Sequence, residues 1–219
     1  MASRESIGAP NPVARDYDAL APEYARRLAG ELDGKPFDRA WLSAFARRMR
    51  GAGLVGDVGC GPGHVSAFLA AEGAEVLGLD LSAGMVAEAR RAYPALCFAQ
   101  ADLLRLGETP GRFAGLLAMY ALIHFDDAVL AAALGACHAA LRPGGDMLAA
   151  VHLGEGTLHP PEMWGIPVTL GFRLFAEGEL EARLTAAGFA VRESVVRAPY
   201  PGVEYPSRRL YLRARRRDG

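Results

Sequence analysis

Asp57-Val58-Gly59-Cys60-Gly61-Pro62-Gly63-His64 is the stretch of this 219-residue chain that decides its fold. It follows a short apolar segment, residues 54–58, which is predicted to be a β-strand, and it precedes a helix expected at residues 65–72. Three glycines at every second position let the backbone approach a ligand closely, and they leave free amide groups at a helix start, where an anionic group binds well. The stretch therefore predicts a nucleotide site at a strand-to-helix turn.

On the C-terminal side of this turn, strands and helices alternate. Ser82 and Asp126 are each expected to begin a helix, and a third helix is expected at residues 177–187. The further strands are expected at residues 75–79, 96–100, 115–120, 147–152, 190–197 and 209–214. This order implies a mostly parallel sheet with right-handed crossovers. The last two strands have no helix between them and should pair antiparallel.

On the N-terminal side, two amphipathic helices are expected before the first strand. Their apolar residues recur every three to four positions within residues 17–28 and 38–49, with Lys35-Pro36 as the break between them. Pro22 is interpreted as a new helix start. Residues 153–175, rich in glycine and proline, are interpreted as one long loop.

Composition excludes several classes of protein. A hydrophobic fraction of 51% suits a buried core, and a net charge of −1 disfavours electrostatic binding of nucleic acid. The three cysteines are widely spaced, which predicts reduced thiols rather than a disulfide framework or a metal site. Since no apolar run reaches about 18 residues, we expect a soluble, cytoplasmic protein without a membrane partner.

Acidic residues follow the next two expected strands. Asp80 ends the second strand, where a carboxylate can accept both hydroxyl groups of a ribose. Asp102 follows the third strand and could accept a hydrogen bond from an adenine amino group, while Leu81 and Leu103 could close over the faces of the base.

Two cofactor classes fit a glycine-rich turn with a ribose-binding acid. A nicotinamide site normally has the spacing GxGxxG, whereas the spacing here is GxGxG. Asp57 directly precedes the glycines, where it would repel a pyrophosphate and attract the amino group of an amino-acid tail. Both features favour S-adenosylmethionine over a nicotinamide cofactor.

With these motifs in order, the chain resembles the class I S-adenosylmethionine-dependent methyltransferases of small-molecule type. The resemblance rests on VGDVGCGPGHVSAFLAAEGAEVLGLDLS (residues 55–82), AQADL (99–103) and LRPGG (141–145). It implies an α/β, Rossmann-like fold with a seven-stranded, mostly parallel sheet, an antiparallel last strand and helices on both faces. Residues 1–50 would then be an N-terminal helical lid within the same domain, and residues 51–219 the methyltransferase domain.

The resemblance also implies roles for individual residues. Asp57 would face the methionine amino group, Asp80 would hold the ribose, and Tyr17 and Tyr24, in YDALAPEYARRL, would lie near the sulfonium and the carboxylate. For these two tyrosines a place in the core is an equal alternative. The expected cofactor-binding set is Tyr17, Tyr24, Asp57, Gly59, Cys60, Gly61, Gly63, Asp80, Leu81, Met85, Asp102, Leu103, Met119 and Tyr120.

Methyl transfer from a sulfonium is an in-line displacement, so the protein mainly aligns the two reactants. His124, shortly after the fourth strand, is the expected general base. His152, His159 and Trp164 are expected to bind the acceptor, although Trp164 would equally suit the core. His64 is interpreted as part of the cofactor turn.

For the residues near the last expected strand, the sequence does not predict a single role. Glu204, Tyr205, Arg208 and Arg209 lie just before or at its start and could approach the acceptor, but surface ion pairs are the preferred interpretation of the two arginines.

These features together predict a methyltransferase for a small-molecule acceptor, as a monomer or homodimer and without a metal. No basic face for nucleic acid is evident, and the fourth strand ends without an NPPY-type motif. A non-catalytic S-adenosylmethionine-binding regulator and a nicotinamide-dependent oxidoreductase stay as alternatives.

Overall fold

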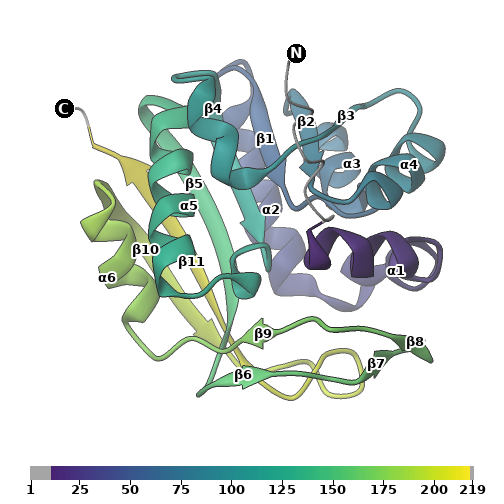
Figure 1. The fold of residues 1–219 in the computed structure, drawn as a ribbon. Coiled ribbons are helices and arrows are strands. Elements are labelled where there is room, and N and C mark those ends of the chain that lie inside the picture. The colour runs from purple at the N-terminus through teal and green to yellow at the C-terminus, as the bar shows by residue number, and fades with distance from the viewer. Residues whose placement is uncertain (1–10, 218–219) are drawn as a thin grey trace, which may run out of the picture.

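The computed structural model describes residues 11–217, so residues 1–10 of the expected lid lie outside the described residues. A seven-stranded sheet forms the centre of the molecule, in the order β10-β11-β5-β4-β1-β2-β3. Helices lie on both faces of this sheet (Figure 1). The strand bounds are β1 Val55–Val58, β2 Val76–Asp80, β3 Cys97–Gln100, β4 Phe113–Met119, β5 Leu141–Leu153, β10 Phe189–Arg197 and β11 Arg208–Arg216.

Strand directions follow the sequence-based prediction. β1 pairs parallel with β2 and β4, and β4 pairs parallel with β5. β11 is antiparallel to both β5 and β10, which confirms the reversed last strand. Because the chain winds outward in both directions from β1 and β4, the carboxyl ends of these two strands flank a crevice where open α/β sheets bind ligands.

The helices bury apolar side chains on the two faces. One face is covered by α5 (Asp127–Ala140), α6 (Glu179–Ala186) and the 3-10 helix η2 (Leu103–Glu108). On the other face, α2 (Pro36–Met49) and α3 (His64–Ala71) pack against β1 and β4. α4 (Ala83–Ala92) packs against β2 and β3.

Two helix starts carry the caps that the sequence predicts. The side chain of Ser82 accepts a hydrogen bond from the Met85 amide, and that of Asp126 accepts one from the Val129 amide. Each bond satisfies an amide that has no partner within its helix.

The prediction that Pro22 begins a new helix is wrong, since Pro22 lies inside the single helix α1 (Pro12–Leu28). A proline there removes the amide that would bond to the Asp18 carbonyl, four residues earlier. The helix continues because tertiary contacts hold this turn: the Asp18 carboxylate accepts hydrogen bonds from the Ser82 hydroxyl (2.6 Å) and the Gly84 amide (2.8 Å). These bonds dock α1 on the start of α4.

Residues 153–175 are not one unstructured loop, which corrects the sequence interpretation. They contain two short antiparallel ribbons, β6 (Thr157–Leu158) with β9 (Phe172–Arg173) and β7 (Glu162–Met163) with β8 (Ile166–Pro167). Two-residue strands carry too little periodicity to be recognised in a sequence. Figure 1 shows both ribbons at the lower edge of the view, with β7 and β8 below α1 and β6 and β9 to their left.

Among residues 11–217, no helix has the length and apolar content that a membrane crossing requires.

Candidate active site

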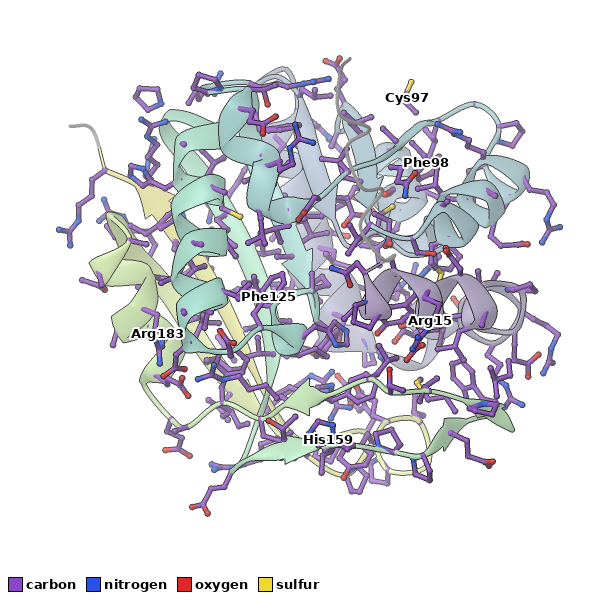
Figure 2. All side chains as sticks on the ribbon, viewed as in Figure 1. Arg15, Cys97, Phe98, Phe125, His159 and Arg183 are labelled. Carbon is purple, nitrogen blue, oxygen red and sulfur yellow. The ribbon has the colours of Figure 1, made fainter. Side chains whose placement is uncertain are left out.

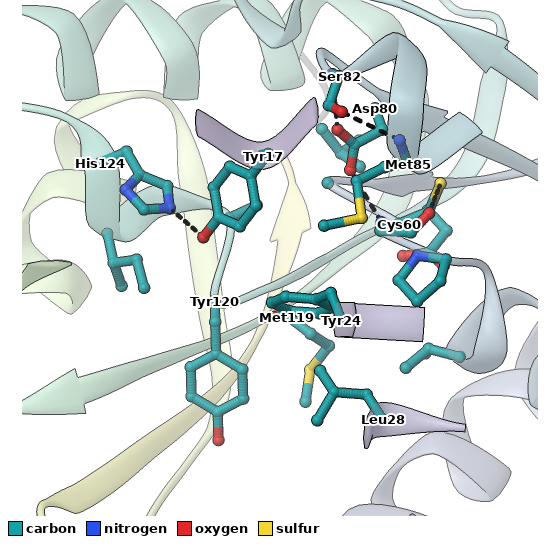
Figure 3. Close-up of a pocket in the computed structure, with 18 of the residues that line it drawn as sticks. Tyr17, Tyr24, Leu28, Cys60, Asp80, Ser82, Met85, Met119, Tyr120 and His124 are labelled. Carbon is teal, nitrogen blue, oxygen red and sulfur yellow. Dashed lines mark hydrogen bonds between the residues drawn. The ribbon is translucent and has the colours of Figure 1, made fainter. Parts of the chain in front are cut away.

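A cavity of about 390 Å³ lies at the carboxyl ends of β1, β2 and β4, and α1 and the 3-10 helix η1 (Glu31–Gly34) contribute to its wall. Its volume is that of a small-molecule site. Figure 3 shows its interior, with side chains from α1, β2 and β4 converging. The expected residues that line it are Tyr17, Tyr24, Asp57, Gly59, Cys60, Gly61, Asp80, Leu81, Met85, Asp102, Leu103, Met119, Tyr120, His124, His152 and Trp164.

The glycine turn forms one wall of the cavity. Gly59 has a φ of +71°, and a Cβ there would lie 2.7 Å from that of Ala121, so only glycine fits. Gly63 has a different task from the one expected. It is not among the residues lining the cavity, and a Cβ there would come within 2.7 Å of the Phe98 ring. Gly63 thus allows α3 to start tightly against β3.

Asp80 holds the turn and still faces the cavity. Its carboxylate accepts hydrogen bonds from the amides of Gly61 and Ser82, both at 2.8 Å. Burial raises the pKa of Asp80, and these backbone amides act against that rise. A carboxylate has about four acceptor positions, so two amide bonds leave room for two hydroxyl donors from a ligand.

Asp57 lies at the base of the cavity with only 2% of its surface exposed. Burial raises its pKa to about 6, and a hydrogen bond from the Ser66 hydroxyl (2.5 Å) acts in the opposite direction. A cationic group placed beside Asp57 would restore its ionised form, because an opposite charge favours the carboxylate.

Both ring nitrogens of His124 are within hydrogen-bond distance of a partner. Its Nδ1 lies 2.9 Å from the Gly171 carbonyl, which can only accept, so Nδ1 carries the proton. Burial lowers the pKa of His124, which favours the neutral ring, and the bare Nε2 then accepts from the Tyr17 hydroxyl at 2.9 Å. Figure 3 shows this bond between α1 and the 3-10 helix η3 (Leu122–His124).

Tyr120 has a backbone conformation that is rare for its residue type. Its φ is +57°, directly after β4. The ring stacks on His152 with a centroid distance of 4.8 Å, and the hydroxyl lies 3.2 Å from that of Tyr211. Backbone strain of this kind persists where the surroundings fix it, typically at functional sites.

Charged residues near the end of the chain also reach the cavity. Arg209 is only 3% exposed; its guanidinium donates to the carbonyls of Tyr205 and Ser207 and lies 3.1 Å from Glu204. The surface ion-pair interpretation is therefore wrong for Arg209. It holds for the exposed Arg208, which pairs with Glu177. Alternation along β11 turns one of these neighbours inward and the other outward.

Sequence reasoning missed a group of charged residues between α1 and α2. Glu31 and Lys35 line the cavity, form an ion pair with each other, and Glu31 also bonds His64 Nε2 at 2.8 Å. The break at Lys35-Pro36 predicts a turn, but no local signal indicates that this turn points inward. Asp38, at the start of α2, lines the cavity as well.

Acidic residues outnumber basic residues in the lining of the cavity. Among the described residues, the cationic ones in its lining are Lys35 and Arg209, whereas six are carboxylates: Glu31, Asp38, Asp57, Asp80, Asp102 and Glu204. Such a lining favours a cationic ligand and disfavours a pyrophosphate or another polyanion.

The structure does not bring all three expected acceptor-binding residues together in one cavity. His152 and Trp164 line the cavity, but His159 lines a neighbouring groove beside Gly171. Figure 2 shows His159 near the lower edge of the view, next to β6. The exposed Cys97 lies at the opposite end of the molecule, far from His159. Trp164 is 38% exposed, so the alternative of a core tryptophan is wrong.

Comparison with known proteins gives a consistent result. Residues 55–145 match a family model described as a methyltransferase domain. Demethylmenaquinone methyltransferase of Beutenbergia cavernae is 34% identical over 143 residues, which are 64% of this chain and 58% of that protein. Trans-aconitate 2-methyltransferase of Methylobacterium nodulans is 41% identical over 99 residues, 44% of this chain and 34% of that protein. The chain thus spans little more than half of the first relative and a third of the second.

Among solved structures, the fold is shared by the 1,6-didemethyltoxoflavin-N1-methyltransferase of Burkholderia thailandensis, crystallised with S-adenosylhomocysteine and its substrate. The TM-score is 0.70 at 24% identity, and the match covers 99% of this chain and 94% of that one.

Proposed function

We propose that the chain is a class I S-adenosylmethionine-dependent methyltransferase, that the cavity under α1 binds S-adenosylmethionine, and that the protein methylates a small-molecule acceptor. The match of residues 55–145 to a methyltransferase-domain model and the methyltransferases among the relatives support this proposal. We propose one domain, in which residues 1–50 form the lid and residues 51–219 the methyltransferase body. The observation that carries the proposal is the acidic pair Asp57 and Asp80 on either side of the glycine turn.

The residues present fit this cofactor. Asp80 keeps acceptor positions for the two ribose hydroxyls, and Asp102 offers a carboxylate on the adenine side. Asp57 is buried and gains from a neighbouring ammonium group. The excess of carboxylates in the lining suits a cationic cofactor and opposes the pyrophosphate of a nicotinamide cofactor.

When bound, the cofactor supplies an activated methyl group on its sulfonium. The protein then has to orient the acceptor and exclude water, and such positioning contributes about 7–11 kcal/mol to catalysis. The aromatic walls formed by Tyr17, Tyr24 and Tyr120 suit this task because they are rigid and partly apolar.

We propose that His124 and Tyr17 handle the proton of the acceptor. The Tyr17 hydroxyl can accept a hydrogen bond from the nucleophile while it donates its own proton to Nε2 of neutral His124. His124 thus acts as the base through Tyr17, and the Gly171 carbonyl stabilises the resulting imidazolium at Nδ1.

A thermal-shift comparison tests the cofactor. S-adenosylmethionine and S-adenosylhomocysteine should raise the unfolding temperature, since a ligand at 100 times its Kd stabilises by about 2.7 kcal/mol. NAD and NADP should leave it unchanged, and a shift with either of them alone would favour the oxidoreductase alternative.

Activity is tested with methyl-labelled cofactor and a panel of hydroxyl, amine, thiol and carboxylate acceptors. Formation of S-adenosylhomocysteine with a labelled product is the expected result. Tight cofactor binding without transfer to any acceptor of the panel would instead support a non-catalytic binding protein.

A further inference from the structure

The large apolar side chains on the surface gather at the mouth of the cavity. Within residues 11–217, five such side chains are exposed, and four of them line this cavity: Leu104, Trp164, Val203 and Tyr205. The fifth, Val196, lies on β10 and is not part of the lining. Apolar side chains that gather around one opening mark a binding surface, whereas singly scattered ones do not.

Trp164 stands out within this rim. It forms a two-residue turn with Gly165 between the paired strands β7 and β8, and both residues have positive φ, +55° and +81°. Turns of this type favour asparagine or glycine at both positions and disfavour a large side chain. A tryptophan here is unfavourable for the turn, so turn formation does not explain its presence.

The indole is held toward the cavity from the lid side. Its ring packs edge-on against Tyr24 at a centroid distance of 5.5 Å, and the Arg27 guanidinium lies 5.2 Å from the ring centre. These contacts fix the orientation of the ring while 38% of the residue stays exposed at the mouth.

Charge restricts what can occupy this mouth. Among the described residues, both cations that line the cavity already form ion pairs. Lys35 pairs with Glu31 and Glu204, and Arg209 pairs with Glu204. Asp38 is balanced by Arg197, which lies outside the lining, whereas Asp57, Asp80 and Asp102 have no ion-pair partner among the described residues. An acceptor that carries several carboxylates would meet repulsion without a free cation to bind it.

We propose that the acceptor is an uncharged molecule with a ring-bearing apolar body, and that this body rests on Trp164, Val203 and Tyr205 while its nucleophile reaches inward toward Tyr17. The inference rests on the proposed methyltransferase function. It assigns Trp164 as a specificity-determining residue and separates this chain from a protein that acts on a polycarboxylate.

The test is calorimetric titration of the protein saturated with S-adenosylhomocysteine. The probes are 1-naphthol, which is an uncharged ring compound near neutral pH, and trans-aconitate, which is a tricarboxylate. Trp164→Asn removes the ring and inserts a residue that the turn favours, so this variant should fold. Val196→Asn is the matched control, because it removes an exposed apolar side chain outside the cavity.

The expected result is saturable binding of 1-naphthol by the wild-type protein and by Val196→Asn, at least about fivefold weaker binding by Trp164→Asn, and no saturable binding of trans-aconitate. Equal 1-naphthol affinity in Trp164→Asn and wild type would overturn the proposal, as would saturable binding of trans-aconitate or absence of 1-naphthol binding. Failure of S-adenosylhomocysteine to bind in the first step would count against the proposed function itself, which keeps the two failures distinct.

Discussion

Replacing Asp80 with alanine removes both the bonds that hold the glycine turn and the ribose contact that we propose for this carboxylate. Its oxygens accept the amides of Gly61 and Ser82 and face the cavity where we place the ribose. Loss of two charge-assisted hydrogen bonds to the ribose should weaken cofactor binding by about 1.5–3 kcal/mol, or about ten- to a hundredfold in Kd. Loss of the amide acceptors should lower the free energy of unfolding by about 1–3 kcal/mol.

Asp18→Ala is the matched control. Asp18 also accepts two hydrogen bonds at the start of α4, from the Ser82 hydroxyl and the Gly84 amide, but it does not line the cavity. This variant should lose stability in the same way as Asp80→Ala and keep its affinity for the cofactor.

Calorimetric titration with S-adenosylhomocysteine and denaturant unfolding measure the two effects. Asp80→Ala should change both Kd and stability, and Asp18→Ala stability alone. An unchanged Kd in Asp80→Ala would refute the assignment of Asp80 to the ribose. An equal loss of affinity in both variants would show that the effect passes through the docking of α4 rather than through direct contact.

Three further variants test separate parts of the account. His124→Asn should remove the acidic limb of the pH–rate profile, which lies below pH 6.5 in the wild type because burial lowers the pKa of His124; unchanged turnover across about pH 6–9 would eliminate its role as a base. Relative to the wild type, Asp57→Asn should gain about 1.4 kcal/mol of stability as the pH rises from 5 to 8, out of a total of about 3 kcal/mol that begins to be lost near pH 3.8. The stabilisation due to protonated Asp57 is complete below its unfolded pKa of 3.8 and is lost as the pH rises through about 6, so an equal stability difference at both pH values, by thermal unfolding, would contradict the burial argument. Asp126→Ala should cost about 1 kcal/mol in urea unfolding, since it removes the cap of α5, and a cofactor Kd equal to that of the wild type is the matching control.

Local chemistry explains which parts of the fold were predictable. A glycine turn after an apolar strand and a capping residue such as Ser82 act over a few residues, so the sequence displays them directly. The antiparallel pairing of the last two strands also follows from local order, because no helix separates them.

What sequence reasoning missed depends on contacts between distant segments. Pro22 stays inside α1 because Asp18 bonds to α4 more than sixty residues away. Arg209 is buried by its contacts with the loop before β11 and with Glu204, although its neighbour Arg208 is exposed. No local signal distinguishes the two arginines.

The residues of the candidate site show the same difference between features that are set locally and features that depend on distant contacts. Asp57 and Asp80 were predictable because their position relative to the strand ends is fixed by the parallel sheet. Glu31 and Lys35 were not, since their inward orientation depends on how the segment between α1 and α2 packs against the rest of the molecule. Trp164 was predicted to bind the acceptor, but its strained turn and its 38% exposure became visible only in the structure.

A crystal structure grown with S-adenosylhomocysteine tests the cofactor site most directly. The account predicts density for the nucleoside in the cavity under α1, with both ribose hydroxyls on the Asp80 carboxylate and the amino group of the tail beside Asp57. Density for the ligand elsewhere on the protein, or a cavity closed by its own side chains in the presence of saturating ligand, would contradict it.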